Sequence, residues 1–360
     1  MSSNINIENV SPIQSPQSLI NKFPVSNTLK NQINIWRDDI QKVISQSDDR
    51  LLTIIGPCSI HDPIAALDYA NSLKKMADKY KNKLLVVMRV YFEKPRTTVG
   101  WKGLINDPQM NESFQIDKGL EIARKLLLDI NNLGLPVGCE FLDVFTPQYI
   151  GDLVSWGAIG ARTTESQVHR QLVSGLSMPI GFKNGTGGSI TIAAQALASA
   201  NSPHVFLGID ENGQASIVRT TGNKECHIIL RGSKKGPNYS SEHMNETSLI
   251  LFKNKQTARI MIDCSHGNSQ KIHKNQILVA ESLAHQIANG DTRIIGTMIE
   301  SNINEGNQKI TQNLLYGVSV TDACVNLIDS DLILNLLANS IDARRSEDHV
   351  RKKIKLFNYE

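Results

Sequence analysis

The sequence lacks several features that would point to particular classes of protein. Its formal net charge is only +3 over 360 residues, so there is no bulk cationic surplus to indicate nucleic acid as a partner. No apolar run approaches the length of a membrane-spanning helix. The first residues lack both the basic and the apolar region of a signal peptide. These absences predict a soluble, cytoplasmic protein with neither a membrane nor a nucleic-acid partner.

Paired cysteines are also absent. The chain has five cysteines, an odd number, with no Cys-x-x-Cys pair: Cys58, Cys139, Cys226, Cys264 and Cys324. Such scattered residues indicate reduced thiols rather than a disulfide framework. Apolar residues make up 40% of the chain and charged residues 20%, a balance typical of globular proteins. The length suits one large α/β barrel or two ordinary domains.

From residue 51 onward, short apolar stretches alternate with segments of helical periodicity. We expect strands over 51–55, 84–90, 137–141, 158–162, 179–183, 226–230, 259–263 and 293–299. The main helices are expected over 62–80, 113–133, 146–157, 167–174 and 189–200. Eight such strands indicate an α/β protein with a (β/α)8 TIM barrel. A doubly wound open sheet is the competing architecture.

Three other segments flank or interrupt this repeat. Residues 1–50 are predicted to form an extended polar arm and an amphipathic helix over 29–43, which either docks on a neighbouring subunit or plugs one end of the domain. Two short strands around Asp210-Glu-Asn-Gly213 predict a β-hairpin insertion, 201–222, between strands five and six. The barrel is expected to span 51–345, with a last helix over 331–344 and a basic tail over 346–360.

Every predicted strand ends in a residue capable of chemistry. In order these are Cys58, Arg89, Glu140, Arg162, Lys183, Arg231, His266 and Glu300. Each taken singly is explained by packing or by a surface ion pair. In a barrel, however, the carboxyl ends of the strands meet at one face, where catalytic residues gather. The set as a whole therefore favours the barrel and places an active site at that face.

These strand-end residues divide by chemistry. The cations suit a ligand that carries phosphate and carboxylate: Arg89, Lys94, Arg162, Lys183 and Arg231. The loop after strand two adds Arg96, Thr97 and Thr98 beside the rigid Pro95. Three of the other strand-end residues, joined by one from the loop before the last helix, are metal-type ligands: Cys58, His266, Glu300 and Asp322. This mixed set suits one first-row divalent ion, Mn, Fe, Co or Zn, although it lacks the local spacing of a zinc motif.

Seven blocks of the sequence carry a family resemblance. They lie at 56–63, 88–98, 160–166, 181–186, 227–232, 263–267 and 319–324. Together they resemble the type I, microbial branch of 3-deoxy-7-phosphoheptulonate (DAHP) synthase, over about residues 15–344. The resemblance implies a metal-dependent transferase that condenses phosphoenolpyruvate with erythrose 4-phosphate. That reaction is the first step of the shikimate pathway to chorismate and the aromatic amino acids.

The resemblance also implies roles for single residues. It assigns the metal to Cys58, His266, Glu300 and Asp322. It places Arg162, Arg231 and the backbone of Ala161 on the phosphate of phosphoenolpyruvate, and Arg89, Lys94 and Lys183 around its carboxylate. Arg96 and Thr97 take the phosphate of erythrose 4-phosphate. The residues expected to act in the chemistry are Lys94, Glu140, Lys183 and His266.

Enzymes of this branch are feedback-inhibited by phenylalanine, tyrosine or tryptophan, which implies an aromatic amino acid effector and a homodimer or homotetramer. The effector pocket would involve Pro147, Leu172 and Ser177 near the hairpin, closed by the arm of a neighbouring subunit. The local sequence at 175–179, 263–268, 300–303 and 316–320 resembles that of the tyrosine-sensitive isoenzymes. The bland alternative is that these three residues pack the outer shell of the barrel.

Two other functions fit parts of the sequence. Lys183, on a barrel strand, suits a Schiff-base aldolase, and the fold also suits an effector-binding barrel without activity. The chain departs from the usual family pattern in three loops: Gly187 replaces the usual Asp, the Trp-Glu pair after Cys324 is absent, and the loop 231–238 carries one extra residue. None of these departures removes a proposed ligand.

Overall fold

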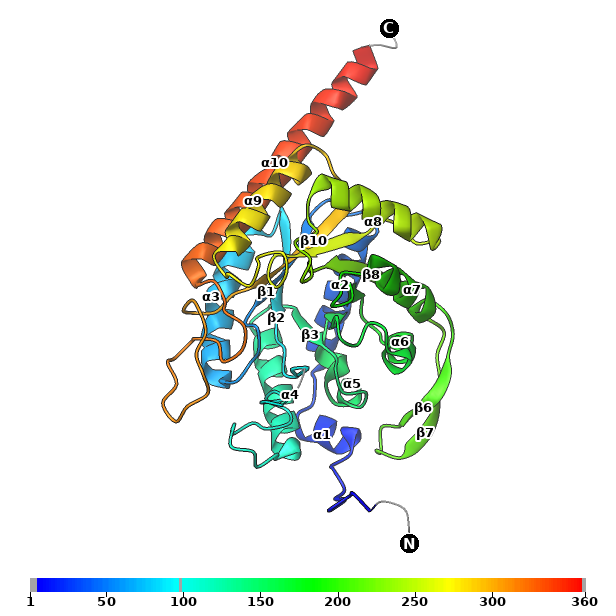
Figure 1. Cartoon of the computed structure of the whole chain (residues 1–360), viewed down its shortest axis with the longest axis vertical. Coiled ribbons are helices and arrows are strands. Elements are labelled where there is room, and N and C mark those ends of the chain that lie inside the picture. Colours follow the sequence, from blue (N-terminus) through cyan, green and yellow to red (C-terminus); the bar gives the residue numbers. More distant parts are fainter. Residues whose placement is uncertain (1–4, 97–98, 358–360) are drawn as a thin grey trace.

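The computed structural model describes residues 5–96 and 99–357. Its eight barrel strands are β1 Leu51–Gly56, β2 Leu84–Arg89, β3 Val137–Glu140, β4 Trp156–Ile159, β5 Ile180–Lys183, β8 Cys226–Leu230, β9 Ile260–Asp263 and β10 Ile294–Glu300. They form a closed barrel in the order β1-β10-β9-β8-β5-β4-β3-β2 (Figure 1). All eight pairings are parallel, and β1 pairs with both β2 and β10. The predicted TIM barrel is confirmed and the open sheet is excluded.

Alternate residues of the strands fill the inside of the barrel. Leu52 and Ile54 of β1 lie in one buried cluster with Val87, Met261 and other inward-facing residues. The helix α2, Asn27–Ile44, adds Ile40, Val43 and Ile44 to this same cluster. These helix residues recur at the 3–4-residue spacing of one helix face. Of the two roles predicted for this helix, the structure shows the plug.

Helices cover the outside of the barrel. They are α3 Pro63–Tyr80, α4 Ile116–Asn132, α5 Thr146–Ile150, α6 Gln167–Val173, α7 Ile190–Ala200, α8 Ser241–Lys253, α9 Asn275–Ala288 and α10 Leu327–Phe357. The start of α3 follows from its sequence: Pro63 takes the first helical position, and the Asp62 side chain accepts hydrogen bonds from the N–H groups of Ile64 and Ala65. None of the helices formed by the described residues has the length and apolarity to cross a membrane.

The hairpin insertion is confirmed as β6 Val205–Ile209 and β7 Ala215–Arg219, an antiparallel pair outside the barrel. The N-terminal arm reaches the tip of this hairpin in its own chain, since the N–H of Gln17 donates to the carbonyl of Glu211 at 2.8 Å. Figure 1 shows the hairpin and the arm on the same side of the molecule.

Several predicted boundaries are wrong. The arm is not wholly extended, because Ser15 caps a short helix, α1 Pro16–Lys22, with Pro16 at its first turn. The helix predicted over 146–157 ends early: α5 stops at Ile150 and a 3-10 turn, η1 Gly151–Leu153, leads into β4. Strand β4 therefore starts at the fully buried Trp156, not at residue 158, and Arg162 lies three residues beyond its end.

The last helix is also longer than predicted. It was expected over 331–344 but runs from Leu327 to Phe357, so most of the predicted basic tail continues α10. The helix lies along α9 and then projects beyond the barrel (Figure 1). Helix-forming Lys and Arg side chains continue the periodic pattern past residue 344, with no Gly or Pro to end it.

Candidate active site

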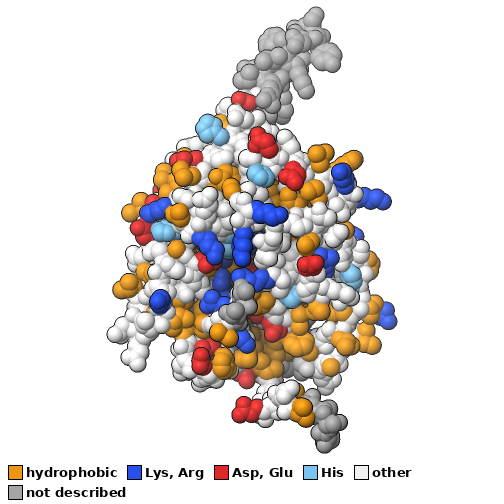
Figure 2. Space-filling model, viewed as in Figure 1, with side chains coloured by type: hydrophobic (Ala, Val, Ile, Leu, Met, Phe, Trp, Pro, Cys, Tyr) orange, Lys and Arg blue, Asp and Glu red, His pale blue; other side chains and the backbone are white. Residues whose placement is uncertain are grey.

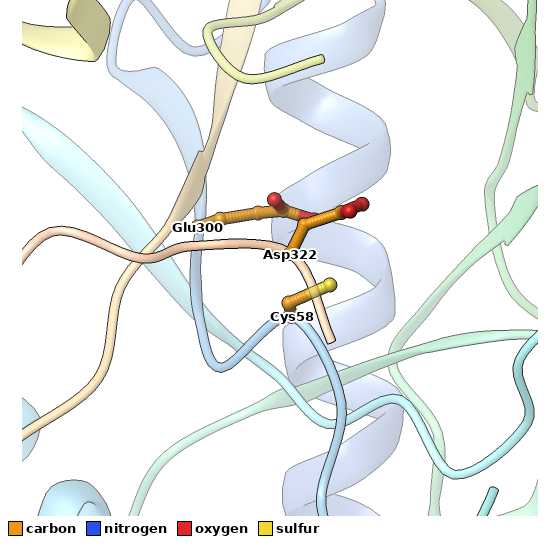
Figure 3. A group of neighbouring side chains, drawn as sticks. All are labelled: Cys58, Glu300 and Asp322. Carbon is orange, nitrogen blue, oxygen red and sulfur yellow. The ribbon is translucent and has the colours of Figure 1, made fainter. Parts of the chain in front are cut away.

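Three metal-type ligands meet at the carboxyl end of neighbouring strands β1 and β10. Cys58 lies two residues after β1, Glu300 ends β10, and Asp322 comes from the long loop before α10. One ligand atom from each of these residues lies within 4.8 Å of the others (Figure 3). Gly56 pairs with Glu300 in the barrel register. The barrel closure therefore brings together residues that are more than 200 positions apart.

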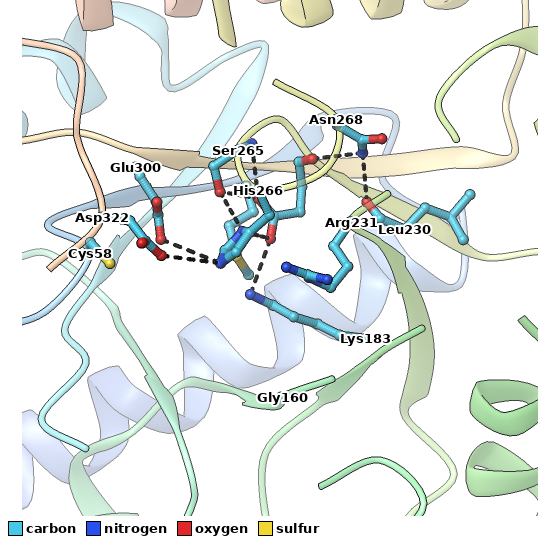
Figure 4. Close-up of polar contacts among 12 residues, drawn as sticks. Cys58, Gly160, Lys183, Leu230, Arg231, Ser265, His266, Asn268, Glu300 and Asp322 are labelled. Atoms are coloured by element: carbon cyan, nitrogen blue, oxygen red, sulfur yellow. Dashed lines mark hydrogen bonds and ion pairs between the residues drawn. The ribbon is translucent and has the colours of Figure 1, made fainter. Parts of the chain in front are cut away.

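The predicted fourth ligand, His266, faces this group. Its Nε2 lies 3.8 Å from Oε1 of Glu300 and 3.9 Å from Oδ2 of Asp322. Its Nδ1 lies 2.9 Å from Oδ2 of Asp263 (Figure 4). His266 has a positive φ of 57°, which is uncommon for a residue with a side chain. A carboxylate on one ring nitrogen is the arrangement that orients a metal-binding histidine through the other.

The residues present fit a divalent cation. One sulfur, one imidazole nitrogen and two carboxylates match the donor set of a first-row metal. Burial, reinforced by Glu300, raises the pKa of the Cys58 thiol, and the nearby Lys94 only partly opposes this. A thiol in this setting becomes a ligand when a cation replaces its proton.

Two cations, one at the end of β2 and one in the loop after it, contact the metal-type ligands. Lys94 Nζ lies 3.2 Å from Cys58 Sγ and 3.1 Å from the Cys58 carbonyl oxygen. Arg89 Nη2 pairs with Glu300 Oε1 at 2.9 Å, and both side chains are 1% exposed. The Arg89 guanidinium also donates to the carbonyl of Pro57 and lies 3.7 Å from the ring centre of Tyr91. Arg89 thus contacts a metal-type ligand directly, and its predicted contact with a substrate carboxylate stays a prediction.

Asp263 belongs to the candidate site, although the sequence interpretation gave it no role. Its carboxylate is fully buried and pairs with Lys183 Nζ at 3.1 Å as well as with His266. Burial acts to raise the pKa of Asp263, but Lys183 and His266 outweigh it and hold that pKa well below its ordinary value. An anionic Asp263 therefore joins the predicted metal ligand to the predicted substrate ligand. The available signal was a lone charged residue at the end of the apolar strand β9.

A cationic cavity opens beside the metal-type group. Its volume is about 880 Å³, and its basic lining residues are Arg96, Arg162, Arg231, Lys234, Lys235 and Lys271. His266 also lines it. Figure 2 shows Lys and Arg side chains gathered in the middle of this face of the molecule. The cavity brings together three of the predicted phosphate ligands and adds three lysines that had not been predicted.

Of the other predicted site residues, Arg96 lines this cavity, whereas Glu140 and Ala161 are not among its lining residues. Arg96 is exposed, and its Nε donates to the carbonyl of Trp101 at 2.8 Å. Thr97 lies outside the described residues. Glu140 ends β3 and packs against the turn after β4, where a Cβ on Gly160 would lie 2.4 Å from Glu140 Oε1. The next residue in that turn is the half-buried Ala161.

The three predicted effector residues do not line this cavity. Pro147 is buried in α5 and Leu172 is 5% exposed in α6, so these two present little surface to a ligand. Ser177 is exposed and lines a groove with Arg37 of α2 and Gly222 at the hairpin base. Their predicted role in effector binding stays a prediction.

Comparisons with known proteins agree with this geometry. The sequence profile described as the DAHP synthetase I family matches residues 22–335. A Phe-sensitive phospho-2-dehydro-3-deoxyheptonate aldolase of Escherichia coli (strain K12) is 54% identical over 343 residues, which cover 95% of this chain and 98% of the relative. A tyrosine-inhibited enzyme of the same name from Schizosaccharomyces pombe is 51% identical, covering 92% of this chain and 91% of the relative.

The same similarity holds for solved structures. The structure of phospho-2-dehydro-3-deoxyheptonate aldolase from Francisella tularensis SCHU S4 matches with a TM-score of 0.92 and 48% sequence identity, covering 94% of this chain and 99% of that one. Sequence and structure therefore match over nearly the whole length of both chains.

Proposed function

Because this chain belongs to the DAHP synthetase I family, we propose that it condenses phosphoenolpyruvate with erythrose 4-phosphate, giving DAHP and inorganic phosphate. The observation that carries this proposal is the contact between two unlike sites. The group of Cys58, His266, Glu300 and Asp322 borders a cavity whose wall bears six Lys and Arg side chains. Two phosphorylated substrates repel each other, and a wall of cations is a means of holding both.

The four metal-type residues would hold one divalent cation, Mn, Fe, Co or Zn. When bound, it would supply Lewis acidity toward an aldehyde oxygen. Arg162 and Arg231 bind the phosphate of phosphoenolpyruvate, and Lys183, with Arg89 and Lys94, lies toward its carboxylate. Arg96 and Thr97 bind the phosphate of the sugar.

In the reaction, carbon 3 of phosphoenolpyruvate forms a bond to the aldehyde carbon of erythrose 4-phosphate. The Lys94 ammonium gives a proton to the forming alkoxide. Water then adds to carbon 2, oriented by Glu140 with Lys183, and the bond from carbon 2 to the phosphate oxygen breaks. Phosphate is the leaving group.

We also propose that an aromatic amino acid inhibits the enzyme, with tyrosine favoured by the local wording of the sequence, and that the active form is a cytoplasmic homodimer or homotetramer. Each aromatic amino acid added in turn to the activity assay identifies the effector. Sedimentation of the purified protein, with and without that effector, gives the subunit number.

The test of the reaction is phosphate release from the two substrates together, compared with either alone. Release should require both, should stop with a chelator and should return with Mn²⁺. Turnover that survives chelation contradicts the metal role. Borohydride trapping of a substrate on Lys183 would instead support the Schiff-base aldolase. A chain that binds an aromatic amino acid but releases no phosphate would be an inactive effector-binding barrel.

A further inference from the structure

The backbone that carries Arg231 is held at every one of its nearby peptide groups. The N–H of Arg231 donates to the side-chain oxygen of Asn184 at 2.8 Å, and its carbonyl accepts from the N–H of Gly267 at 3.0 Å. The N–H of Gly232 donates to the side-chain oxygen of Asn238 at 2.7 Å, and its carbonyl accepts from Nδ2 of Asn184 at 3.2 Å. No rotation of this dipeptide is possible without breaking a buried hydrogen bond.

Three asparagines from three different loops make these contacts. Asn184 follows β5, Asn238 closes the turn after β8, and Asn268 follows β9. They are 0%, 8% and 4% exposed. Asn238 Nδ2 donates to Asn184 Oδ1 at 3.2 Å, and the N–H of Asn238 donates to Asn268 Oδ1 at 2.8 Å. We call these three residues the asparagine network.

The network extends to the loop that carries His266. Asn268 Nδ2 donates to the carbonyls of Leu230 and Asp263, at 3.1 and 2.8 Å (Figure 4). The two loops also touch backbone to backbone, because a Cβ on Gly232 would lie 2.5 Å from the carbonyl carbon of Gly267. Gly232 has a φ of +69°, which a side chain disfavours. The network therefore binds the residue before Arg231 to the residue that orients His266.

We propose that the asparagine network is a set of positioning residues that fixes Arg231 against Lys183 and His266. The proposal rests on the proposed function, since it assigns Arg231 to the phosphate of phosphoenolpyruvate. Two of the asparagines lie close to site residues in the chain, since Asn184 follows Lys183 and Asn268 lies two residues after His266. The third, Asn238, accepts a hydrogen bond from the N–H of Gly232, which follows Arg231. The network thus ties the phosphate end of the site to the metal-type end.

An amide is the side chain that suits this position. It offers two donors and an acceptor without charge, so Asn184 accepts from two N–H groups through its oxygen and donates through its nitrogen. A carboxylate would lack the donor and would add a buried charge beside Arg231. An alanine would leave buried N–H and C=O groups unpaired, which is costly. The loop 231–238, which is one residue longer than the usual family pattern, forms a turn in which the backbones of Ser233 and Gly236 hydrogen-bond to each other. Asn238 of the network ends this loop.

The test is the Asn238→Ala variant of the full chain. KM for phosphoenolpyruvate should rise by about 10-fold or more, the range seen when a supporting residue around a site is lost. KM for erythrose 4-phosphate should stay within about twofold of wild type, because Arg96 belongs to another loop. The matched control is Asn131→Ala: Asn131 is 2% exposed and donates to the carbonyls of Leu127 and Leu153, far from the site. That variant should lose stability and keep both KM values.

An active Asn238→Ala enzyme with wild-type KM for phosphoenolpyruvate overturns the network, as does an equal rise in both KM values. If the variant does not fold, hydrogen–deuterium exchange on the wild-type protein decides. Peptides covering 230–238 should be protected although they form a loop, and rapid exchange there contradicts the proposal. A wild-type protein that releases no phosphate from the two substrates contradicts the proposed function instead, and the exchange result then stands by itself.

Discussion

The two ends of the barrel differ in the polar groups that they bury. At the carboxyl end, two buried ion pairs, Lys183 with Asp263 and Arg89 with Glu300, lie beside the uncharged asparagine network. Toward the amino end, where α2 plugs the barrel, the buried side chains include Trp156 and His227. Trp156 Nε1 donates to His227 Nε2 at 3.3 Å, and burial lowers the pKa of His227 to about 3. That histidine is neutral.

The difference supports the proposal that the carboxyl end carries the chemistry and the amino end the stability of the fold. Buried ion pairs add little to stability compared with apolar residues of the same size, so their presence at the carboxyl end points to chemistry. The neutral, tightly packed amino end does the opposite: it adds apolar burial and offers no reactive group. Substitutions at the carboxyl end should therefore change activity more than folding, and substitutions at the amino end should do the reverse.

The largest effect is expected from Cys58→Ala at the carboxyl end. Loss of the single thiolate ligand should remove the metal and lower activity by at least ~100-fold, while the circular dichroism spectrum stays that of wild type. The metal content of the dialysed protein measures metal loss, and phosphate release measures activity. Cys139→Ala is the control, because Cys139 is also buried, on β3, but lies outside the metal-type group. Wild-type metal content in Cys58→Ala would remove Cys58 from the ligand set.

The next effect separates two cations on one loop. Lys94→Ala should lower kcat by ~100-fold or more, since a positioned general acid contributes at least that much, while its KM values change less. Arg96→Ala should mainly raise KM for erythrose 4-phosphate, by roughly 10-fold, because Arg96 is exposed at the mouth of the cavity. Steady-state kinetics with both substrates varied gives each constant. If Arg96→Ala lowers kcat and leaves KM unchanged, Arg96 acts in the chemical step and not in binding of erythrose 4-phosphate, which contradicts the assignment.

The sequence predicted the barrel, and the strand ends where the candidate site lies, because both leave local signals. An apolar strand of four to seven residues ending in Arg89, Glu140, Lys183 or Glu300 shows where the chain reaches the carboxyl face. Strand β4 was misplaced because the apolar stretch from Trp156 also fits a continued helix. Its bounds depend on pairing with β3 and β5, which no local pattern reports.

The supporting residues could not be predicted in the same way. Asp263, Asn184, Asn238 and Asn268 act through partners on other strands. In the sequence, an asparagine after a strand is an ordinary loop residue. Only the closed barrel shows that three such loops meet. The metal-type ligands were recognised as a set by their chemistry, whereas the groups that orient them have no distinctive chemistry of their own.

The smallest effect tests the amino end. In the unfolded chain His227 has an ordinary pKa of 6.5, and in the folded protein burial lowers that pKa to about 3. Between these values the unfolded chain binds a proton that the folded chain does not, so unfolding free energy falls as pH falls from 6.5 toward 3. By pH 4 this amounts to a few kcal/mol at most.

His227→Gln keeps an acceptor for Trp156 but does not titrate, so its unfolding free energy should fall less between pH 7 and pH 4 than that of wild type, with kcat unchanged at pH 7. Urea unfolding at several pH values measures the difference. His204→Gln, at a half-buried histidine outside the barrel whose Nε2 contacts the carbonyl of Ser199, is the control and should keep the acid sensitivity of wild type. A parallel pH dependence in wild type and His227→Gln would mean that the amino end holds a charged histidine, and the contrast between the two ends would then fail.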